Sequence, residues 1–256
     1  MKIVVVGGTG LVGSKLVKKL QQAGHHSLAA SPGTGVDAVS GDGLELALEG
    51  AEVVVDVTNA PNWNADAATD FFLTATGNIL AAEAKADVAH HVVLSVVGAD
   101  RPSGNGYFRA KLAQEEAVQG STVPYTILRA AQFFEFIDRI VESSMNGDRL
   151  YLPPVFIQPE SADDVAATLA EIALGEPVNG IVELAGPQEF RLDELVLRKL
   201  SADDDQRRVT VDIQAPYFGA ELNYFSLTPD RNARIAPTHF EDWLSQATAL
   251  EATPAA

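Results

Sequence analysis

Short apolar runs alternate with longer amphipathic segments over the first 130 residues. Runs of Val, Ile and Leu without polar positions between them are typical of strands buried on both faces of a parallel sheet. Apolar residues three or four positions apart predict helices that cover such a sheet. The expected strands are 2–6, 27–30, 38–40, 52–57, 91–96 and 125–129, and the expected helices are 11–23, 66–86 and 107–118. This alternation predicts an α/β fold with a doubly wound parallel sheet.

The pattern is less regular after residue 129. We expect helices at 132–146, 161–174, 192–200 and 240–247, and strands at 181–184 and 209–213. We find no internal repeat and no low-complexity linker. We therefore predict a single domain, residues 1–256, with a small C-terminal lobe on the substrate side drawn mainly from about 147–160 and 187–235.

A glycine-rich segment joins the first strand to the first helix. Glycine permits a tight turn, a close approach of a pyrophosphate and tight packing of the helix on its strand. The free N–H groups and the positive dipole end of the helix favour an anion. A structural turn without a ligand is the alternative. We predict a dinucleotide site that includes Gly7, Thr9, Gly10, Leu11, Val12 and Gly13.

The end of the second strand bears on the choice of dinucleotide. A site for NAD usually has an acidic residue there that binds the ribose hydroxyls. The chain has no acid before Asp37 and no Arg in this loop. Ser31, Thr34 and the backbone can hold a 2′-phosphate through neutral donors. We therefore predict NADP as the cofactor, with NAD as the alternative.

The segment Gly41-Asp42-Gly43 follows the third expected strand. The Asp42 carboxylate is placed to accept a hydrogen bond from the adenine amino group. It is equally suited to cap the N-terminus of a helix at 43–48, and both roles are compatible.

Composition narrows the function further. With 18 Lys and Arg against 35 Asp and Glu, the formal net charge is −17, which disfavours a nucleic acid as partner. The absence of Cys excludes a disulfide scaffold and a thiolate nucleophile, and agrees with a reducing cytoplasm. An apolar strand begins at residue 2, and no apolar run has the length of a membrane helix. We expect a cytoplasmic protein that acts on a small molecule without a membrane partner, as a monomer or a homodimer.

A second group of residues suggests catalysis. Tyr107 and Lys111 are four positions apart and therefore share a helix face. An ammonium group beside a phenol lowers the pKa of the phenol and makes it a better acid–base catalyst. The lysine can also reach the nicotinamide ribose. Ser95 ends a strand at the ligand-binding edge of the sheet and can polarise a carbonyl. We predict Ser95, Tyr107 and Lys111 as the catalytic residues.

These motifs resemble the short-chain dehydrogenase/reductase superfamily, and most closely its atypical NmrA-like branch. The likeness rests on the glycine-rich turn and on later motifs along most of the chain: Gly41-Asp42, Leu94–Gly98, Tyr107–Lys111, Pro124–Arg129, Ser161–Ala166 and Leu184–Pro187. The resemblance implies a Rossmann fold, NAD(P) binding and hydride transfer. It implies that Tyr107 is the general acid, that Lys111 is its modulator and a ribose ligand, and that Ser95 orients the carbonyl. It also implies that Asn59 and Ala60 lie along the cofactor.

Two positions depart from that family pattern. Ser31-Pro32 stands where many NADP-using relatives have a basic residue, and Ala130-Ala131 replaces a common Pro-Gly pair. The first departure weakens the prediction of NADP, and the second concerns the shape of the nicotinamide pocket.

The resulting hypothesis is an NADP(H)-dependent oxidoreductase that reduces a small carbonyl, a quinone or a related electrophile. The alternatives are a non-catalytic NAD(P)-sensing regulator of the NmrA-like type and an epimerase or dehydratase with tightly held NAD. Among the aromatic residues near the expected cleft, Trp63 and Phe134 are candidates for substrate contacts. Phe133 and Phe136 fit the buried stripe of a helix.

We predict no metal site. Neither His25-His26 nor His90-His91 has further ligands at the spacing that a metal requires, and both pairs are expected in surface turns.

Overall fold

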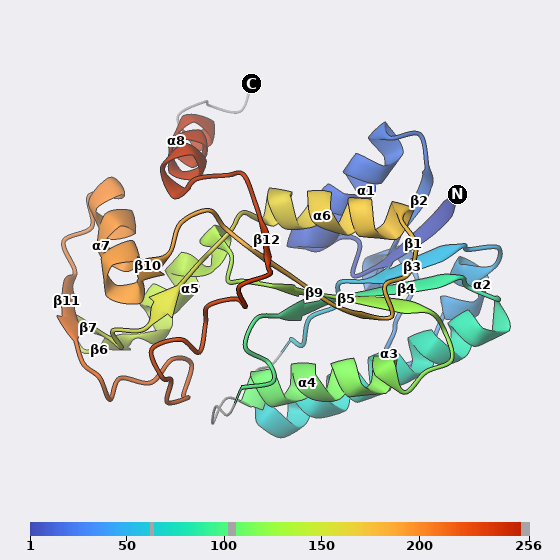
Figure 1. The fold of residues 1–256 in the computed structure, drawn as a ribbon, viewed down its shortest axis with the longest axis horizontal. Coiled ribbons are helices and arrows are strands. Elements are labelled where there is room, and N and C mark those ends of the chain that lie inside the picture. Colours follow the sequence, from blue (N-terminus) through green and yellow to red (C-terminus); the bar gives the residue numbers. More distant parts are fainter. Residues whose placement is uncertain (62–63, 102–105, 252–256) are drawn as a thin grey trace. The chain divides into compact units, whose positions relative to one another are not determined.

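The computed structural model describes residues 1–61, 64–101 and 106–251. It shows a seven-stranded sheet in the order β12-β9-β5-β4-β3-β1-β2, with helices on both faces (Figure 1). The pairings of β1 with β2, β1 with β3, β3 with β4, and β4 with β5 are all parallel. This confirms the predicted Rossmann-type α/β fold. The strands are β1 (Lys2–Val6), β2 (His26–Ala30), β3 (Val53–Asp56), β4 (His90–Val96), β5 (Tyr125–Ala130), β9 (Gly180–Ala185) and β12 (Arg234–Ile235).

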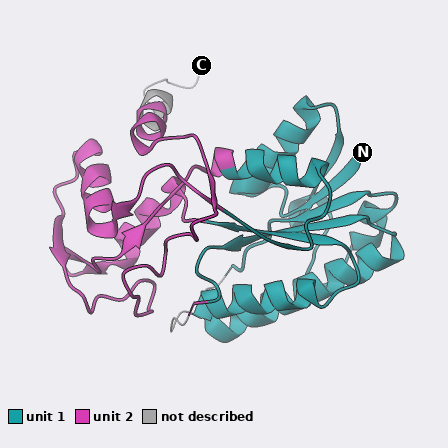
Figure 2. Cartoon of the chain, viewed as in Figure 1, with its two compact units in different colours: residues 1–100, 106–130, 165–183 teal, residues 101–105, 131–164, 184–256 magenta. Residues whose placement is uncertain are grey.

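The chain divides into two compact units (Figure 2). The first comprises residues 1–100, 106–130 and 165–183, and it holds β1 to β5 and most of β9. The described residues of the second are Arg101, 131–164 and 184–251. The segments expected to form a C-terminal lobe, about 147–160 and 187–235, lie in this second unit.

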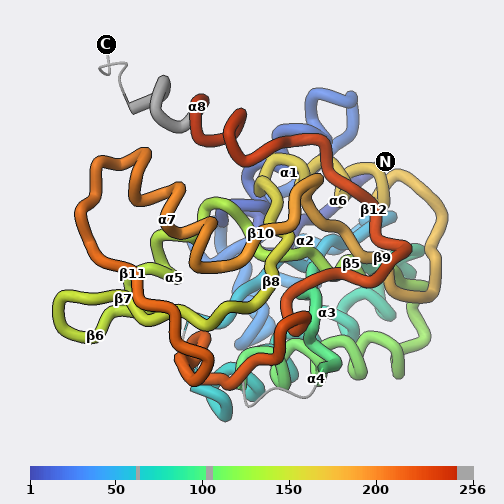
Figure 3. Tube along the Cα trace, turned by 60° about the vertical axis from the view of Figure 1, so that its left-hand side comes forward, coloured from blue at the N-terminus to red at the C-terminus, as the bar shows by residue number. Residues whose placement is uncertain are grey.

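In the first unit, two helix layers enclose the sheet. Figures 1 and 3 show α3 and α4 side by side on one face, and α1 on the other face with the part of α6 that belongs to this unit. The strands are apolar on both sides, because residues 3–6 and 53–55 are buried along their whole length. The helices are α1 (Leu11–Gln22), α2 (Leu44–Leu48), α3 (Ala65–Lys85), α4 (Gly106–Gln119) and α6 (Ala162–Leu174), with a 3-10 turn η1 (Pro32–Thr34).

The second unit has its own small sheets and helices. One sheet pairs β8 (Phe156–Ile157) with β10 (Phe190–Arg191), and the other has the order β11-β7-β6. β12 pairs with Leu184 and Ala185, the end of β9 that belongs to this unit. The other elements are η2 (Phe134–Phe136), α5 (Ile137–Ser143), β6 (Met145–Asn146), β7 (Arg149–Leu152), α7 (Leu192–Ala202), β11 (Arg208–Val211) and α8 (Phe240–Glu251).

The expected strand at 38–40 is wrong. This segment is a turn, because the Asp37 carboxylate accepts hydrogen bonds from the backbone N–H of Val39 at 2.8 Å and of Ser40 at 3.3 Å. Backbone N–H groups that are bonded to a nearby side chain in this way are not available for hydrogen bonds to a neighbouring strand.

The expected helix at 132–146 is shorter and begins later than predicted. Because η2 precedes α5, the residues that enter the core are shifted along the chain. Phe134 is 1% exposed, whereas Phe133 and Phe136 are only half-buried. The assignment of Phe133 and Phe136 to the core is therefore corrected.

The expected surface turn at His90-His91 is also wrong, since both residues are buried in β4. His91 Nδ1 lies 2.7 Å from Glu83 Oε1, and both side chains are fully buried. Burial disfavours the imidazolium, but the charge and hydrogen bond of Glu83, with the charge of Asp56, raise the pKa of His91 above its usual value. The pair ties α3 to β4 inside the first unit.

None of the helices in the described part of the chain combines the length and the apolar character that crossing a membrane requires.

Replacing His91 with Ala is expected to lower the free energy of unfolding by about 3–5 kcal/mol, because Glu83 then loses its partner in the protein interior. Urea titration followed by circular dichroism measures this loss. The matched control is His26→Ala, an exposed position in β2, which should change the free energy by less than about 0.5 kcal/mol. Equal effects of the two substitutions would contradict a special role for the buried pair.

Candidate functional site

The glycine-rich turn, residues 7–13, follows β1 at the point where the strand order reverses. β1 pairs with β2 on one side and with β3 on the other. In sheets of this kind, ligands bind outside the carboxyl ends of the strands at such a switch point. The topology therefore places the glycine turn where a ligand is expected.

Glycine is required at three positions of this turn, and at Gly8 a Cβ would lie 2.7 Å from the carbonyl oxygen of Val5. Gly7 has a φ of +84°, and a Cβ there would meet the backbone of Val57 at 2.9 Å. At Gly13, a Cβ would lie 2.3 Å from the carbonyl oxygen of Gly7. The turn therefore brings the first turn of α1 against the end of β1, with no room for a side chain between them.

The start of α1 is suited to an anionic group. Gly10 is the N-cap, and no side chain caps the helix. The N–H groups of a first helical turn have no acceptor within the helix, and the helix dipole adds to their attraction for phosphate. These residues fit the pyrophosphate of a dinucleotide.

Thr58 is a further residue of this region that the sequence analysis missed. Its Oγ1 is buried and has no hydrogen-bond partner among the described residues, and a Cβ at Gly7 would lie 3.0 Å from its backbone nitrogen. A buried hydroxyl without a partner is costly unless a ligand or water satisfies it. Its place directly after a buried strand was the available signal.

The residues expected near the adenosine ribose form a compact turn. Thr9 Oγ1 and Ser31 Oγ are 2.9 Å apart, which connects this turn to the glycine turn. Thr34 Oγ1 accepts a hydrogen bond from Ser31 N and lies 2.9 Å from the carbonyl oxygen of Ala29. Asp37, the first acid after β2, uses its carboxylate in its own turn.

Asp42 is exposed, and Gly43, with a φ of +74°, is the N-cap of α2 without a side-chain cap. The expected capping role of Asp42 is therefore not seen. A Cβ at Gly43 would lie 2.3 Å from the carbonyl oxygen of Gly35, so Gly43 lets the two loops touch.

Residues 57–60, which follow β3, contact both the glycine turn and helix α4. The backbone of Val57 and Thr58 adjoins Gly7, as described above. The next residue, Asn59, is exposed, and its Oδ1 accepts a hydrogen bond of 3.1 Å from the hydroxyl of Tyr107. Ala60 is buried in a cluster with Phe72. One segment therefore connects the expected cofactor site with Tyr107.

The structure brings Tyr107 and Lys111 to the same aromatic ring. The Phe72 ring lies edge-on to Tyr107, with centroids 5.9 Å apart, and the Lys111 ammonium is 4.4 Å from its centroid. Lys111 also donates to the carbonyl of Leu94 at 2.7 Å and to the side chain of Gln114.

The expected effect of Lys111 on Tyr107 is wrong. Burial raises the pKa of Tyr107 above its ordinary value instead of lowering it. Burial also lowers the pKa of Lys111 to about 8, against the opposing charges of Asp56 and Glu115. Tyr107 is therefore a protonated phenol at neutral pH.

Ser95 lies at the expected carboxyl end of β4, but its hydroxyl is directed to another residue. It is 5% exposed and donates a hydrogen bond of 2.5 Å to Glu115 Oε1. The same carboxylate also receives two hydrogen bonds from Arg129.

The two expected substrate residues fall elsewhere. Trp63 lies outside the described residues. Phe134 belongs to the second unit, where its ring packs against Phe240 at 5.4 Å and Trp243 at 5.3 Å. The structure thus places Phe134 in the interior of that unit rather than on an open surface.

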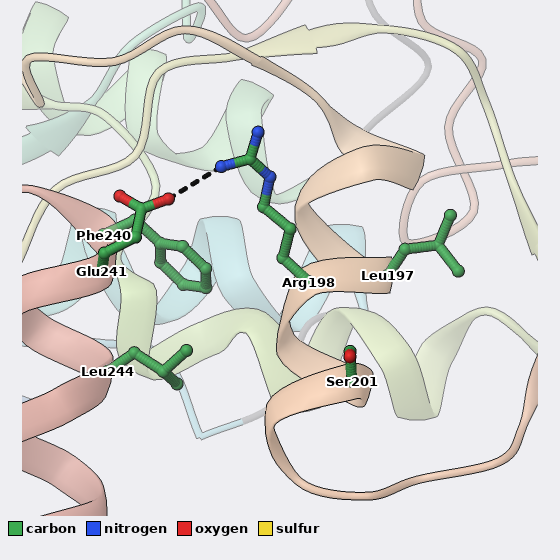
Figure 4. Close-up of a pocket in the computed structure, with 6 residues that line it drawn as sticks. All are labelled: Leu197, Arg198, Ser201, Phe240, Glu241 and Leu244. Atoms are coloured by element: carbon green, nitrogen blue, oxygen red, sulfur yellow. Dashed lines mark hydrogen bonds and ion pairs between the residues drawn. The ribbon is translucent and has the colours of Figure 1, made fainter.

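The second unit also contains a pocket of about 510 Å³ between α7 and α8 (Figure 4). Two of its lining residues are charged, Arg198 and Glu241, and they are 2.7 Å apart. None of the described residues predicted for the site is among those that line it. The lining residues are Leu197, Arg198, Ser201, Phe240, Glu241 and Leu244.

A model of a family described as NAD(P)H-binding matches residues 7–174, which include the glycine turn, Asn59, Tyr107 and Lys111. The chain belongs to this NAD(P)H-binding family. A nicotinamide cofactor is thereby supported for the site, as predicted, and the choice between NAD and NADP is left open.

Two curated relatives are reductases. The chain is 34% identical over 144 residues to the (4-alkanoyl-5-oxo-2,5-dihydrofuran-3-yl)methyl phosphate reductase of Streptomyces griseus. This alignment covers 51% of this chain and 48% of the reductase. The chain is also 26% identical over 253 residues to the chloroplastic divinyl chlorophyllide a 8-vinyl-reductase of Arabidopsis thaliana. That alignment covers 83% of this chain and 61% of the vinyl-reductase. The chain therefore spans about half to three fifths of the length of these relatives.

The fold is similar to that of MoeE5, whose structure was solved in complex with UDP-glucose and NAD. The TM-score is 0.72 at 17% identity, with 99% of this chain and 100% of that one covered. At this identity the similarity concerns the fold.

Gly13→Ala is expected to weaken NAD(P)H binding by about tenfold or more, because the new methyl group displaces the Gly7 carbonyl and opens the turn. Fluorescence titration with NADPH and with NADH measures the dissociation constants. Gly77→Ala in α3 is the control, since a Cβ there meets nothing within 4 Å. Unchanged affinity in Gly13→Ala would contradict the assignment of the turn.

Lys111 should make stability depend on pH. Its pKa is about 8 in the folded protein and about 10.4 when unfolded, so between these values the unfolded chain binds more protons. The free energy of unfolding of the wild type, relative to that of Lys111→Met, should therefore rise by about 2–3 kcal/mol from pH 8 to pH 10.5. Urea titrations at both pH values test this, and a constant or falling difference would contradict it.

Proposed function

We propose that this protein is an NADPH-dependent reductase of a small carbonyl compound, a quinone or a related electrophile. The observation that carries the proposal is the continuity of residues 57–60, which adjoin the glycine turn at Gly7 and hold the hydroxyl of Tyr107 through Asn59. A cofactor site and a proton donor therefore share one segment. That two curated relatives are named as reductases supports reduction as the reaction class.

The glycine turn would hold NADPH, which would supply the hydride for the reduction. Tyr107 delivers the proton to the substrate oxygen, so that a carbonyl becomes an alcohol and the phenol regains its proton from solvent. The raised pKa of Tyr107 keeps the phenol protonated before the reaction. In the absence of substrate, the phenol of Tyr107 donates a hydrogen bond to Asn59 Oδ1, which fixes the direction of the hydroxyl.

Preference for NADPH is supported by the end of β2. The first acid after β2 is Asp37, and its Oδ1 accepts hydrogen bonds within its own turn, so no acid stands directly after β2 to bind the ribose hydroxyls as in an NAD site. Turnover with NADPH and with NADH, compared side by side, tests the preference. Faster turnover with NADH would contradict it.

Tyr107→Phe is expected to lower kcat by about 10²–10⁴-fold, because the proton donor is removed, and to leave the affinity for NADPH nearly unchanged. The assay follows oxidation of NADPH against a panel of aldehydes, ketones and quinones. Tyr125→Phe, at the opposite end of the sheet in β5, is the control and should keep the wild-type rate.

Full activity of Tyr107→Phe would contradict the mechanism. Tight binding of NADPH without oxidation of any panel substrate by the wild type would favour the NAD(P)-sensing regulator instead.

A further inference from the structure

Three buried side chains in the first unit form a polar cluster that the predicted catalytic role of Ser95 does not explain, the Ser95–Glu115–Arg129 cluster. Glu115 is fully buried, and Ser95 and Arg129 are 5% and 6% exposed. The Glu115 carboxylate accepts hydrogen bonds from Ser95 Oγ at 2.5 Å, from Arg129 Nε at 2.9 Å and from the Arg129 guanidinium NH2 at 2.6 Å. Arg129 also pairs with Asp100 at 2.7 Å.

The cluster joins one helix to two strands. Ser95 in β4 and Arg129 in β5 are directly paired across the sheet, and Glu115 reaches them from α4. Charge-assisted hydrogen bonds are short and directional, whereas apolar packing permits small sliding movements. The three contacts therefore fix the position of α4 along the ends of β4 and β5.

Tyr107 lies on the same helix, eight residues before Glu115. Between them, Lys111 donates to Leu94 in β4, and Gln114 donates to Asp56 in β3 at 3.0 Å. Polar contacts on the buried side of α4 therefore hold the helix to the sheet. A shift of the helix moves the phenol, and a displacement of about 1 Å is enough to slow a reaction strongly.

The cluster also uses the only hydroxyl hydrogen of Ser95. An ionised carboxylate accepts hydrogen bonds but does not donate them, so Ser95 is the donor in its contact with Glu115. The hydroxyl then has only lone pairs left for other partners. It is not arranged to donate to a substrate carbonyl.

We propose that the Ser95–Glu115–Arg129 cluster is a positioning unit that holds α4, and with it Tyr107, at the carboxyl ends of β4 and β5. Ser95 acts through the position of Tyr107 and not as a donor to the substrate. This inference rests on the proposed reductase function, since it assigns a task to residues that support the proton donor.

The test is a set of variants in which the effect of the cluster is measured with and without the phenol. Glu115→Gln and Ser95→Ala, each in the wild type and in Tyr107→Phe, are assayed by single-turnover oxidation of NADPH with the fastest-reduced substrate of the panel. In the wild type, each should lower the rate about tenfold, with little change in the dissociation constant of NADPH from fluorescence titration. In Tyr107→Phe, neither should lower the residual rate more than about twofold, because residues that act as one unit are not additive.

The double variant Ser95→Ala/Glu115→Gln should be no slower than the slower single variant, for the same reason. Ser95→Ala removes only one hydroxyl group, so it yields a folded protein even where Glu115→Gln does not. Glu83→Gln is the matched control. It also alters a fully buried carboxyl group in the first unit, but one that contacts His91, and it should leave the rate unchanged.

Two outcomes separate this inference from the proposed function. A Tyr107→Phe variant with the wild-type rate would contradict the reductase mechanism. If Tyr107→Phe is slow, and adding Ser95→Ala or Glu115→Gln to it slows the reaction a further tenfold, the positioning role is contradicted but the reductase mechanism is not. A Glu83→Gln variant as slow as Glu115→Gln would also overturn it, because any loss of a buried carboxylate would then have the same effect.

Discussion

The close approach of backbone segments at the end of β1 is the constraint on which the site depends. Gly13 packs its helix directly on the Gly7 carbonyl, and Gly7 packs directly on the residues that follow β3. No side chain fits at either contact. Because the first turn of α1 and residues 57–60 meet here, an anion-binding helix end and the loop that holds Tyr107 occupy the same edge of the sheet. A larger residue at either glycine would separate them.

Charged side chains are buried inside the first unit of a chain that has a strongly negative net charge. The formal net charge is −17, yet Lys111 and Arg129 are buried, at 3% and 6% exposed. Each is satisfied by several acceptors: Lys111 by Leu94 and Gln114, and Arg129 by Glu115 and Asp100. Buried charges of this kind are costly unless they are paired, and we propose that the Ser95–Glu115–Arg129 cluster fixes one arrangement of α4 on the sheet. We propose that backbone N–H groups of the glycine turn bind the anionic cofactor.

The hydrogen-bond directions alter the interpretation of the predicted catalytic residues. The phenol of Tyr107 is directed to Asn59, the hydroxyl of Ser95 to Glu115, and the ammonium of Lys111 to Leu94 and Gln114. Tyr107 is thus the residue of the three that adjoins the loop after β3. Lys111 lies on the side of α4 that faces the sheet, and Ser95 faces α4 from β4. We propose that Ser95 acts through the position of Tyr107.

The sequence by itself determined the parallel α/β fold, the glycine turn and the places of Ser95, Tyr107 and Lys111 on their elements. These follow from local periodicity, and from glycine at positions where only glycine fits. The tertiary structure decided that His90 and His91 are buried, and that Phe134 is in the core in place of Phe133 and Phe136. It also decided that Glu115 is the hydrogen-bond partner of Ser95 and that Asn59 is the partner of Tyr107. The structure likewise decided that burial raises the pKa of Tyr107, whereas the sequence predicted that Lys111 lowers it. Such features depend on side chains from distant segments and on the water that they exclude, and neither is encoded in the spacing of residues along the chain.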